Sequence, residues 1–340
     1  MKERMLIIMN ESYYNHYNNF NNHSYYPEGI LVTTTENSDY ASDPVYLEKA
    51  MLSGKILESR AVLCDSNHNL TVDLGTVKGI IPREEAALGI SDGSVRDIAI
   101  ITRVNKPVAF KVMKVFKEKN GEITAWLSRA EAQRECVENY ISKLKTGDII
   151  DAKVTHLEPF GCFADIGCGI IAMIPIDSIS VSRIMHPKDR FYPGQFIKAV
   201  VKDIDRESGK ITLSHKELLG TWEENAAHFQ MGMTASGIIR SVEDYGVFVE
   251  LAPNLAGLAE FKEEIHPGQH TAVFIKSIIP DKMKIKLIII DCFDGEFSAG
   301  RFNYYIDRGH LDRWVYSPSG CGKVVESVFS ENKELKAVVH

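Results

Sequence analysis

Two stretches of the sequence decide the fold, because they repeat one pattern at a fixed distance. Residues 147–163 read GDIIDAKVTHLEPFGCF, and residues 232–248 read GMTASGIIRSVEDYGVF. Both begin with glycine, continue as a long strand-like run and end in aromatic-Gly-x-aromatic, 85 positions apart. Because self-similarity at a fixed period marks repeat architectures, the two stretches indicate tandem copies of one structural unit.

The correspondence continues downstream of both stretches. Residues 193–195 (PGQ) match 267–269, and residues 210–213 (KITL) match 284–287 (KIKL), in each case 74 positions apart. The later copy therefore lacks 11 residues of the central loop. A match at several spaced points, always in the same order, is not expected by chance.

A more diverged copy precedes these two. Gly54 corresponds to Gly147, and residues 73–75 (DLG) correspond to 165–167 (DIG), with offsets of 93 and 92 positions. Each copy contains short β-rich runs separated by Gly, Asp, Asn and Pro, as in small barrels and sandwiches. Three units of roughly 65–85 residues predict an all-β fold of three tandem five-stranded barrels joined by short helical linkers.

The chain is predicted to divide into a lead-in, three barrels and a C-terminal extension. The boundaries are 1–50 for an Asn- and Tyr-rich disordered lead-in, 51–136, 144–218 and 229–291 for the barrels, and 292–340 for an extension of unknown role. Helical linkers are expected within 131–143 and 216–229. In the lead-in, residues 10–26 (NESYYNHYNNFNNHSYY) show neither a strand nor a helix period. In the extension, the aromatic-rich residues 302–316 are expected to be ordered, and residues 324–329 to form a closing strand or helix.

The composition is that of a globular protein, with 44% hydrophobic and 25% charged residues among 340. The net charge of −7 and a pI near 5.9 exclude a strongly basic protein that coats nucleic acid by charge alone. The three barrels carry +2, 0 and −2, so the acidity lies in the lead-in, the joints and the extension. The barrels are neutral as a set, and an anionic ligand has to be bound by local features.

The six cysteines are scattered without a CxxC pair and fit reduced thiols better than a disulfide framework. No apolar run approaches the roughly 18 residues of a spanning helix, so the protein is expected to be cytoplasmic and without a membrane partner. Cys162 and Cys168 lack neighbouring His ligands, and residues 317–324 (SPSGCGKV) lack the first glycine and the Ser/Thr of a phosphate loop. No metal, no cofactor and no catalytic residue is therefore expected.

The repeated unit resembles the S-one-type RNA-binding repeat of the bacterial ribosomal protein S-one family. The resemblance rests on the aromatic-Gly-x-aromatic segment, on the Lys-Ile-x-Leu strand, and on the joint LSHK at 213–216 followed by WEENA at 222–226. It covers roughly residues 52–291 and is strongest for the second and third units. It implies an oligonucleotide/oligosaccharide-binding (OB) barrel in each unit, in a non-enzymatic protein that binds single-stranded mRNA at the small ribosomal subunit.

The resemblance also implies which side chains meet RNA. In the family the RNA face carries an aromatic pair, a histidine on the third strand, and an aspartate and a basic residue near the last hairpin. These positions are Phe160, Phe163, Asp205 and Lys210 in the second barrel, and Tyr245, Phe248, Asp281 and Lys284 in the third. The histidine position holds Pro175 or Glu260 instead. Aromatic rings on such a face stack bases without reading their sequence.

The first barrel departs from this pattern, because its aromatic positions fall near His68 and Thr71. It is expected to bind RNA poorly. In the family, leading repeats can serve for docking to protein, so the resemblance implies that residues 51–136 are a module that docks to the small ribosomal subunit. Its lysine-rich stretch at 106–119 leaves two interpretations open, a solvated hairpin or a contact with phosphate.

Alternative interpretations remain open at this point. The rings can be core residues, the two aspartates can cap hairpin turns, and the lysines can be solvated. The chain could also be an RNA-decay or transcription accessory factor, a nuclease or modifying enzyme with its chemistry in 292–340, or a scaffold whose barrel faces bind peptide. The Asn- and Tyr-rich lead-in is a solvated tail or, alternatively, an arm that touches RNA or the ribosome.

Overall fold

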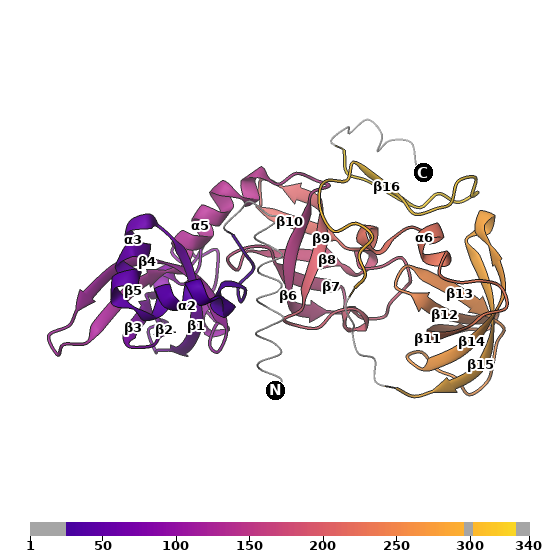
Figure 1. Cartoon of the computed structure of the whole chain (residues 1–340), viewed down its shortest axis with the longest axis horizontal. Coiled ribbons are helices and arrows are strands. Elements are labelled where there is room, and N and C mark those ends of the chain that lie inside the picture. Colours follow the sequence, from indigo (N-terminus) through magenta and orange to yellow (C-terminus); the bar gives the residue numbers. More distant parts are fainter. Residues whose placement is uncertain (1–24, 296–301, 331–340) are drawn as a thin grey trace. The chain divides into compact units, whose positions relative to one another are not determined.

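The computed structural model describes residues 25–295 and 302–330, and these contain three closed five-stranded barrels and a separate two-stranded sheet (Figure 1). The predicted all-β fold of three tandem barrels is thereby confirmed. The chain forms two compact units. Unit 1 comprises the described residues up to 144 together with 165–171, and unit 2 comprises 145–164 and the described residues from 172 onward.

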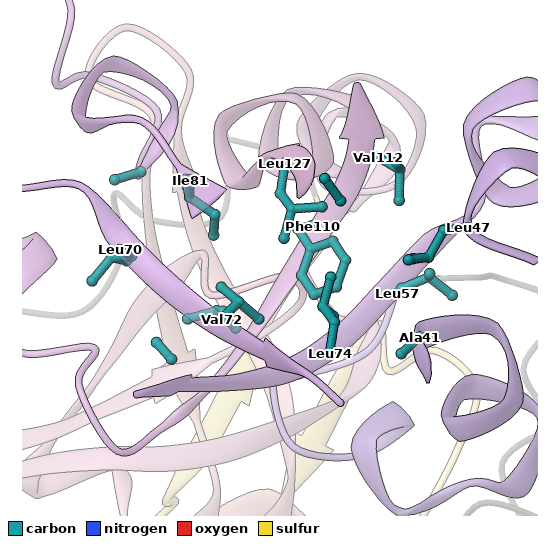
Figure 2. Close-up of a cluster of buried hydrophobic side chains, with 14 of the residues drawn as sticks. Ala41, Leu47, Leu57, Leu70, Val72, Leu74, Ile81, Phe110, Val112 and Leu127 are labelled. Atoms are coloured by element: carbon teal, nitrogen blue, oxygen red, sulfur yellow. The ribbon is translucent and has the colours of Figure 1, made fainter. Parts of the chain in front are cut away.

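Barrel 1 has the strand order β1-β2-β3-β5-β4, in which only β3 and β5 run parallel. Its strands are β1 (Ile56–Cys64), β2 (Leu70–Leu74), β3 (Val77–Ile81), β4 (Pro107–Lys117) and β5 (Ile123–Ser128). The short helices η2 (Arg83–Glu85) and α4 (Ile98–Ile101) lie between β3 and β4. Alternate residues of each strand point inward, so Leu70, Val72 and Leu74 meet Phe110 and Leu127 in one core (Figure 2).

The residues before barrel 1 are folded. They form η1 (Leu31–Thr33), α2 (Thr35–Ser42) and α3 (Pro44–Ser53). Thr34 and Asp43 cap the two α-helices through their side chains, and Leu47 is fully buried in the core of barrel 1. The disordered lead-in predicted over 1–50 is therefore too long, because its second half has helix caps and an apolar face. Residues 1–24 and most of the stretch at 10–26 lie outside the described residues.

A buried carboxylate anchors this N-terminal segment. Glu28 accepts hydrogen bonds from Arg129 Nε at 2.7 Å and from the backbone N–H of Ala109 at 3.0 Å. The backbone N–H of Glu28 donates to Asp165 Oδ2 at 2.7 Å. Glu58 in turn accepts from the backbone N–H of Gly29 at 2.9 Å. Polar groups that are buried here are therefore paired, as a stable fold requires.

Barrels 2 and 3 repeat the five-stranded architecture. Barrel 2 contains β6 (Ile149–Glu158), β7 (Gly161–Asp165), β8 (Ile171–Pro175), β9 (Phe196–Asp205) and β10 (Lys210–Ser214), and barrel 3 contains β11 (Thr234–Glu243), β12 (Gly246–Ala252), β13 (Leu255–Ala259), β14 (His270–Ile279) and β15 (Lys284–Phe293). The predicted helical linkers are confirmed as α5 (Arg129–Asn139) with η3 (Ile141–Lys143), and as η6 (Lys216–Leu219) with α6 (Trp222–Ala226). Three further short helices are η4 (Ile176–Ser178), η5 (Pro187–Asp189) and η7 (Pro280–Lys282).

Barrels 2 and 3 are docked to each other within unit 2 by the β8–β9 loop, which contains the 11 extra residues of the second copy. Arg190 of this loop is fully buried and bonds Glu250 of β12. Arg240 of β11 donates from Nε to the same carboxylate at 2.8 Å. The backbone N–H of Val181 donates to Asn254 Oδ1 at 2.9 Å. The loop insertion therefore has a structural role, because it supplies the contacts with the next barrel.

The C-terminal residues 302–330 are ordered, as expected, and pack on both barrels of unit 2. They include β16 (Arg313–Val315) and β17 (Glu326–Val328), which pair with each other. Trp314 enters the core of barrel 3, whereas Phe329 packs beside Val200 and Leu218 of barrel 2. The strand expected within 324–329 thus exists, but it pairs with β16 and closes no barrel.

Candidate nucleic-acid interface

The first predicted stacking pair lies on the surface of barrel 2. Phe160 occupies the turn between β6 and β7, and 54% of its surface is exposed. Phe163 lies two residues into β7 and is half-buried. The ring centroids are 6.1 Å apart with an interplanar angle of 88°, which is an edge-to-face pair. One ring is therefore supported by the barrel and the other projects into solvent.

The glycine between the rings is required by a close backbone approach. A Cβ atom on Gly161 would lie 2.5 Å from the carbonyl oxygen of Ile174 on β8. The same carbonyl contact recurs in barrel 3, where a Cβ on Gly246 would lie 2.5 Å from the Ala259 oxygen. Any side chain here would push β7 or β12 away from its neighbour. The motif therefore places the rings by letting two strands come close.

The second predicted pair repeats this geometry in barrel 3. Tyr245 is 70% exposed at the β11–β12 turn, and Phe248 is half-buried on β12. Their ring centroids are 6.2 Å apart at an interplanar angle of 86°. The two barrels thus present the same kind of apolar platform from equivalent positions. The explanation that all four rings are core residues is excluded for Phe160 and Tyr245 by their exposure.

A third ring of barrel 2 was missed by the sequence analysis. His156 near the end of β6 stacks on Phe163 with a centroid separation of 6.4 Å and an interplanar angle of 26°. Its Nε2 atom lies 2.6 Å from Glu158 Oε1, which holds the imidazole in place. The available signal was its position four residues before Phe160, on the strand that pairs with β7. In barrel 3 the equivalent position is Ser241, so this ring belongs to barrel 2 alone.

Asp205 acts first as a turn cap. Its carboxylate accepts from the backbone N–H of Glu207 at 3.0 Å, from the N–H of Ser208 at 3.2 Å and from the Ser208 hydroxyl. The hydroxyl and backbone donors of Ser208, in that order, hold the pKa of this carboxyl below its usual range. Lys210 lies opposite Asp205 in the β9–β10 ladder and is exposed. Of these two, Lys210 is the side chain free to meet a phosphate, and its RNA contact stays a prediction.

The remaining predicted positions of barrel 3 are exposed. Asp281 lies in η7 and Lys284 begins β15, and Met283 between them adopts a left-handed backbone with φ of 49°. Glu260, at the family's histidine position, is exposed and lies 3.8 Å from Lys276 Nζ. A carboxylate at this position is unfavourable for a phosphate, so the predicted contacts of barrel 3 are its ring pair and Lys284.

Barrel 1 has no ring pair at the corresponding turn. Asn69 replaces the glycine, donates from Nδ2 to Asp65 Oδ2 at 2.9 Å and accepts from the backbone N–H of Arg83 at 3.0 Å. His68 has a left-handed backbone with φ of 62°, and its Nδ1 lies 3.9 Å from Asp97 Oδ2. Thr71 lies on β2 and is partly buried. This turn is therefore a polar, internally bonded loop, which agrees with the sequence analysis.

Three further features were sought in the part of the chain that the structure describes: a metal site, a disulfide and a membrane-spanning helix. No cluster of three or more His, Cys, Asp or Glu side chains within it could hold a metal ion. All six cysteines are unpaired by disulfides, and burial raises the pKa of the Cys162 thiol to about 12. Across 25–295 and 302–330, no helix has both the length and the apolar character needed to cross a bilayer.

Comparison with known proteins agrees with the barrel geometry. Residues 143–216, which hold barrel 2, match the family described as "S1 RNA binding domain". The chain is 28% identical over 247 residues to the small ribosomal subunit protein bS1 of Rhizobium meliloti, covering 67% of this chain and 42% of the relative. It is 29% identical over 260 residues to bS1 of Staphylococcus aureus, covering 72% of this chain and 63% of the relative.

A solved structure is similar over a comparable stretch. It is a multidomain protein with nucleic acid binding domains from Streptococcus pneumoniae, 12% identical, covering 70% of this chain and 73% of that one with a TM-score of 0.24. The predicted resemblance to the ribosomal S-one family is confirmed by the domain match and the bS1 relatives. The chain spans between two fifths and just under two thirds of the length of those two relatives.

Proposed function

We propose that this protein binds single-stranded RNA, including mRNA, through the ring pairs of barrels 2 and 3, and that it acts in translation at the small ribosomal subunit. The observation that carries the proposal is the recurrence of one edge-to-face pair, with an exposed outer ring, in both barrels. Exposed rings on a barrel surface stack unpaired bases at about 1–3 kcal/mol per base. The domain match and the bS1 relatives support the same ligand and the same cellular context.

Docking of the two barrels favours cooperation between their ring pairs. The buried ion cluster of Arg190, Glu250 and Arg240 holds barrels 2 and 3 within one unit. A strand that has bound one pair therefore meets the second pair at a high effective concentration. Because stacking does not read base edges, recognition is largely tolerant of sequence. Lys210 and Lys284 add phosphate contacts, so affinity falls with added salt.

The proposal assigns no catalytic residue and no cofactor. The rings, the exposed lysines and the turn-capping Asp205 form a binding surface without a nucleophile paired to a base. The enzyme alternative assigns its chemistry to residues 292–340. Within that extension, residues 302–330 contribute Trp314 and Tyr316 to the core of barrel 3 and pack on barrel 2. We therefore favour a structural role for this segment over the nuclease alternative.

Binding of a 12-nucleotide oligouridylate by the full chain tests the stacking surface. We expect the Phe160→Ala, Tyr245→Ala double variant to lose affinity by about 30-fold or more, since two stacked bases are lost. The matched control is Tyr46→Ala, Tyr192→Ala, which removes two exposed rings outside the platforms and leaves affinity unchanged. Equal affinity of wild type and the platform variant would exclude stacking at these rings.

Sedimentation with purified small ribosomal subunits tests the cellular context. We expect the full chain to co-sediment with the subunit and the platform variant to do so less efficiently at low salt. If the chain binds the oligonucleotide but never sediments with subunits, it is an RNA-decay or transcription accessory factor instead. That outcome leaves the RNA-binding surface intact and overturns only its place in translation.

A further inference from the structure

Barrel 1 carries an exposed ring pair at a place that the repeat alignment does not point to. Trp126 on β5 is 48% exposed, and Phe116 on β4 lies beside it with a centroid separation of 5.7 Å and an interplanar angle of 87°. We name the surface formed by Phe116, Trp126, Lys78 and Lys114 the β4–β5 patch. Its members lie on three adjacent strands, because β5 pairs with both β3 and β4.

The strand register explains why these side chains meet on the outer face. Lys114 is the cross-strand partner of Trp126, and Trp126 is paired on its other side with Ile80 of β3. Two residues earlier on β5, Thr124 is the cross-strand partner of Phe116 on β4 and of Lys78 on β3. The neighbouring residues of β5 on either side of Trp126 are buried, so the tryptophan has to point outward.

The geometry of this pair is that of the two proposed RNA platforms. Its edge-to-face angle of 87° falls between the 88° of the Phe160–Phe163 pair and the 86° of the Tyr245–Phe248 pair. In all three pairs one ring is half-buried and contacts a second ring that is exposed. The half-buried ring of barrel 1 is Phe116, and the exposed ring is Trp126.

Lysines lie on the same strands as the ring pair of barrel 1 and on the adjacent β3. Lys114 Nζ lies 5.4 Å from the centroid of Phe116, and Lys78 and Lys117 are exposed on the same strands. None of these three lysines forms an ion pair with another residue of 25–295 or 302–330. Lys111, in contrast, is engaged by Glu135 at 2.5 Å. The lysines of the patch are therefore available to an external anion.

We propose that the β4–β5 patch is a further single-stranded nucleic-acid site, in which a base stacks on Trp126 and Lys114 and Lys78 contact the flanking phosphates. The ligand class rests on the proposed function, whereas the site is new and lies on a different strand pair. A protein partner is less well matched, since lysine is depleted from protein–protein interfaces while an aromatic ring among lysines suits a single strand. Barrel 1 is then a third binding barrel in place of a docking module.

Tryptophan fluorescence gives this site a readout of its own. The chain has three tryptophans, and Trp222 and Trp314 are buried, so Trp126 is the one that a ligand can reach. We expect titration of the full chain with a 12-nucleotide oligouridylate to quench fluorescence, and Trp126→Phe to abolish the ligand-dependent part. The Leu52→Ala variant, which removes an exposed apolar side chain of α3, is the control and keeps the quenching.

Two variants test the chemistry of the site. Trp126→Ala should weaken oligonucleotide binding by about five-fold or more, because one stacked base is lost. Lys114→Ala should lower the slope of log affinity against log salt by about 0.7, the value for one phosphate contact on a single strand. The control Lys49→Ala, at an exposed lysine of α3, should leave that slope unchanged. An unchanged salt slope for Lys114→Ala contradicts the phosphate contact.

Two measurements distinguish the site on barrel 1 from the ring pairs of barrels 2 and 3. In the Phe160→Ala, Tyr245→Ala background, we expect the Trp126 quenching to persist at higher ligand concentration. If oligonucleotide binds wild type without any quenching of Trp126, the patch is not a nucleic-acid site, while barrels 2 and 3 keep theirs. If Trp126→Ala spares oligonucleotide affinity but abolishes sedimentation with ribosomal subunits, the patch is a protein-docking surface and the inference is wrong.

Discussion

In barrels 2 and 3 the exposed ring of the edge-to-face pair lies at the turn between the first two strands, whereas in barrel 1 the edge-to-face pair lies on the last two strands. In barrels 2 and 3 a glycine lets the strands approach and sets the rings at that turn. In barrel 1 the same turn is closed by Asp65 and Asn69, and the ring pair lies on β4 and β5. The outward positions of a strand face away from the core, so different barrels can carry a ring pair on different strands.

The barrels also differ in how they are held. The long β8–β9 loop of barrel 2 reaches Glu250 and Asn254 of barrel 3. Barrel 1 packs against the N-terminal helices, and Glu28 pairs with Arg129 inside unit 1. Loop length and buried ion pairs, and not the repeated strands, therefore distinguish one barrel from another.

Removal of the shared carboxylate should break the docking of barrels 2 and 3. Glu250→Ala leaves the buried Arg190 without its partner, and loss of one member of a buried pair costs about 3–5 kcal/mol. We expect a lower midpoint of urea unfolding, measured by circular dichroism. Glu260→Ala removes an exposed partner of Lys276 and should cost about 0–1 kcal/mol. Equal effects of the two variants would contradict a docking role for Glu250.

Two of the buried titratable groups, Asp165 and His215, should give the free energy of unfolding opposite pH dependence. Burial and the nearby Glu28 carboxylate raise the pKa of Asp165 to about 7 in the folded state, against about 3.9 unfolded. Folding thus favours its protonated form, and the stability it contributes is lost as pH rises from about 4 through 7. Burial lowers the pKa of His215 to about 4, against about 6.5 unfolded. Its contribution is present above pH ~6.5 and is lost as pH falls toward 4.

Urea unfolding between pH 5 and about 8 separates these two contributions. The stability of wild type relative to Asp165→Asn should fall with rising pH, and relative to His215→Gln it should rise, each by at most about 1.4 kcal/mol per pH unit. His215 is held by Ile179 O at 3.0 Å and by the Tyr304 hydroxyl at 3.1 Å, so Gln keeps polar groups at the site. If both differences in stability, to Asp165→Asn and to His215→Gln, changed with pH in the same direction, the opposite roles given to Asp165 and His215 would be wrong.

A side chain added at Gly161 of barrel 2 should lower the free energy of unfolding by less than Glu250→Ala does. Gly161→Ala places a Cβ 2.5 Å from the Ile174 oxygen, and overpacking of this kind costs about 1–3 kcal/mol. The variant should also displace Phe160 and weaken oligonucleotide binding. Gly322→Ala is the control, because nothing lies within 4 Å of the added atom. If Gly161→Ala matches wild type in both stability and affinity, the glycine does not position the ring.

The smallest effect is expected for the ring that barrel 2 has and barrel 3 lacks. His156→Ala removes the imidazole stacked on Phe163 and should reduce affinity for oligouridylate about five-fold, equivalent to about 1 kcal/mol. Ser241→Ala, at the equivalent position of barrel 3, should leave affinity unchanged. The two Kd values can be compared by fluorescence anisotropy of a labelled oligonucleotide. A similar loss in both variants would remove the distinction between the barrels.

Much of the fold could be predicted from the internal repeats alone. Two copies in close register and a more diverged third copy revealed the number of barrels. The lead-in was misjudged, because its composition is polar while its folding depends on a few buried residues. Leu47 and Glu28 meet partners far along the chain, including Arg129, and such contacts leave no local signal.

The sequence could predict the exposed rings only where they belong to the repeated motif. Phe160 and Tyr245 were found from the motif, whereas Trp126 was not, because its partner Phe116 is ten positions away on another strand. The sequence left two interpretations of Asp205 open, since a turn cap and a ligand use the same residue type, and the structure shows the turn cap. Cross-strand neighbours become visible only when the register of the sheet is known.

The sequence by itself determined three barrels and two of their ring pairs, because periodicity, glycine and aromatic spacing are local properties. Only the tertiary structure decided how the barrels are held together and where barrel 1 exposes its rings. Those features depend on residues distant in sequence, such as Arg190 with Glu250 and Lys114 with Trp126. Burial makes the loss of either member of the first pair costly, and strand pairing brings the second pair together on the surface.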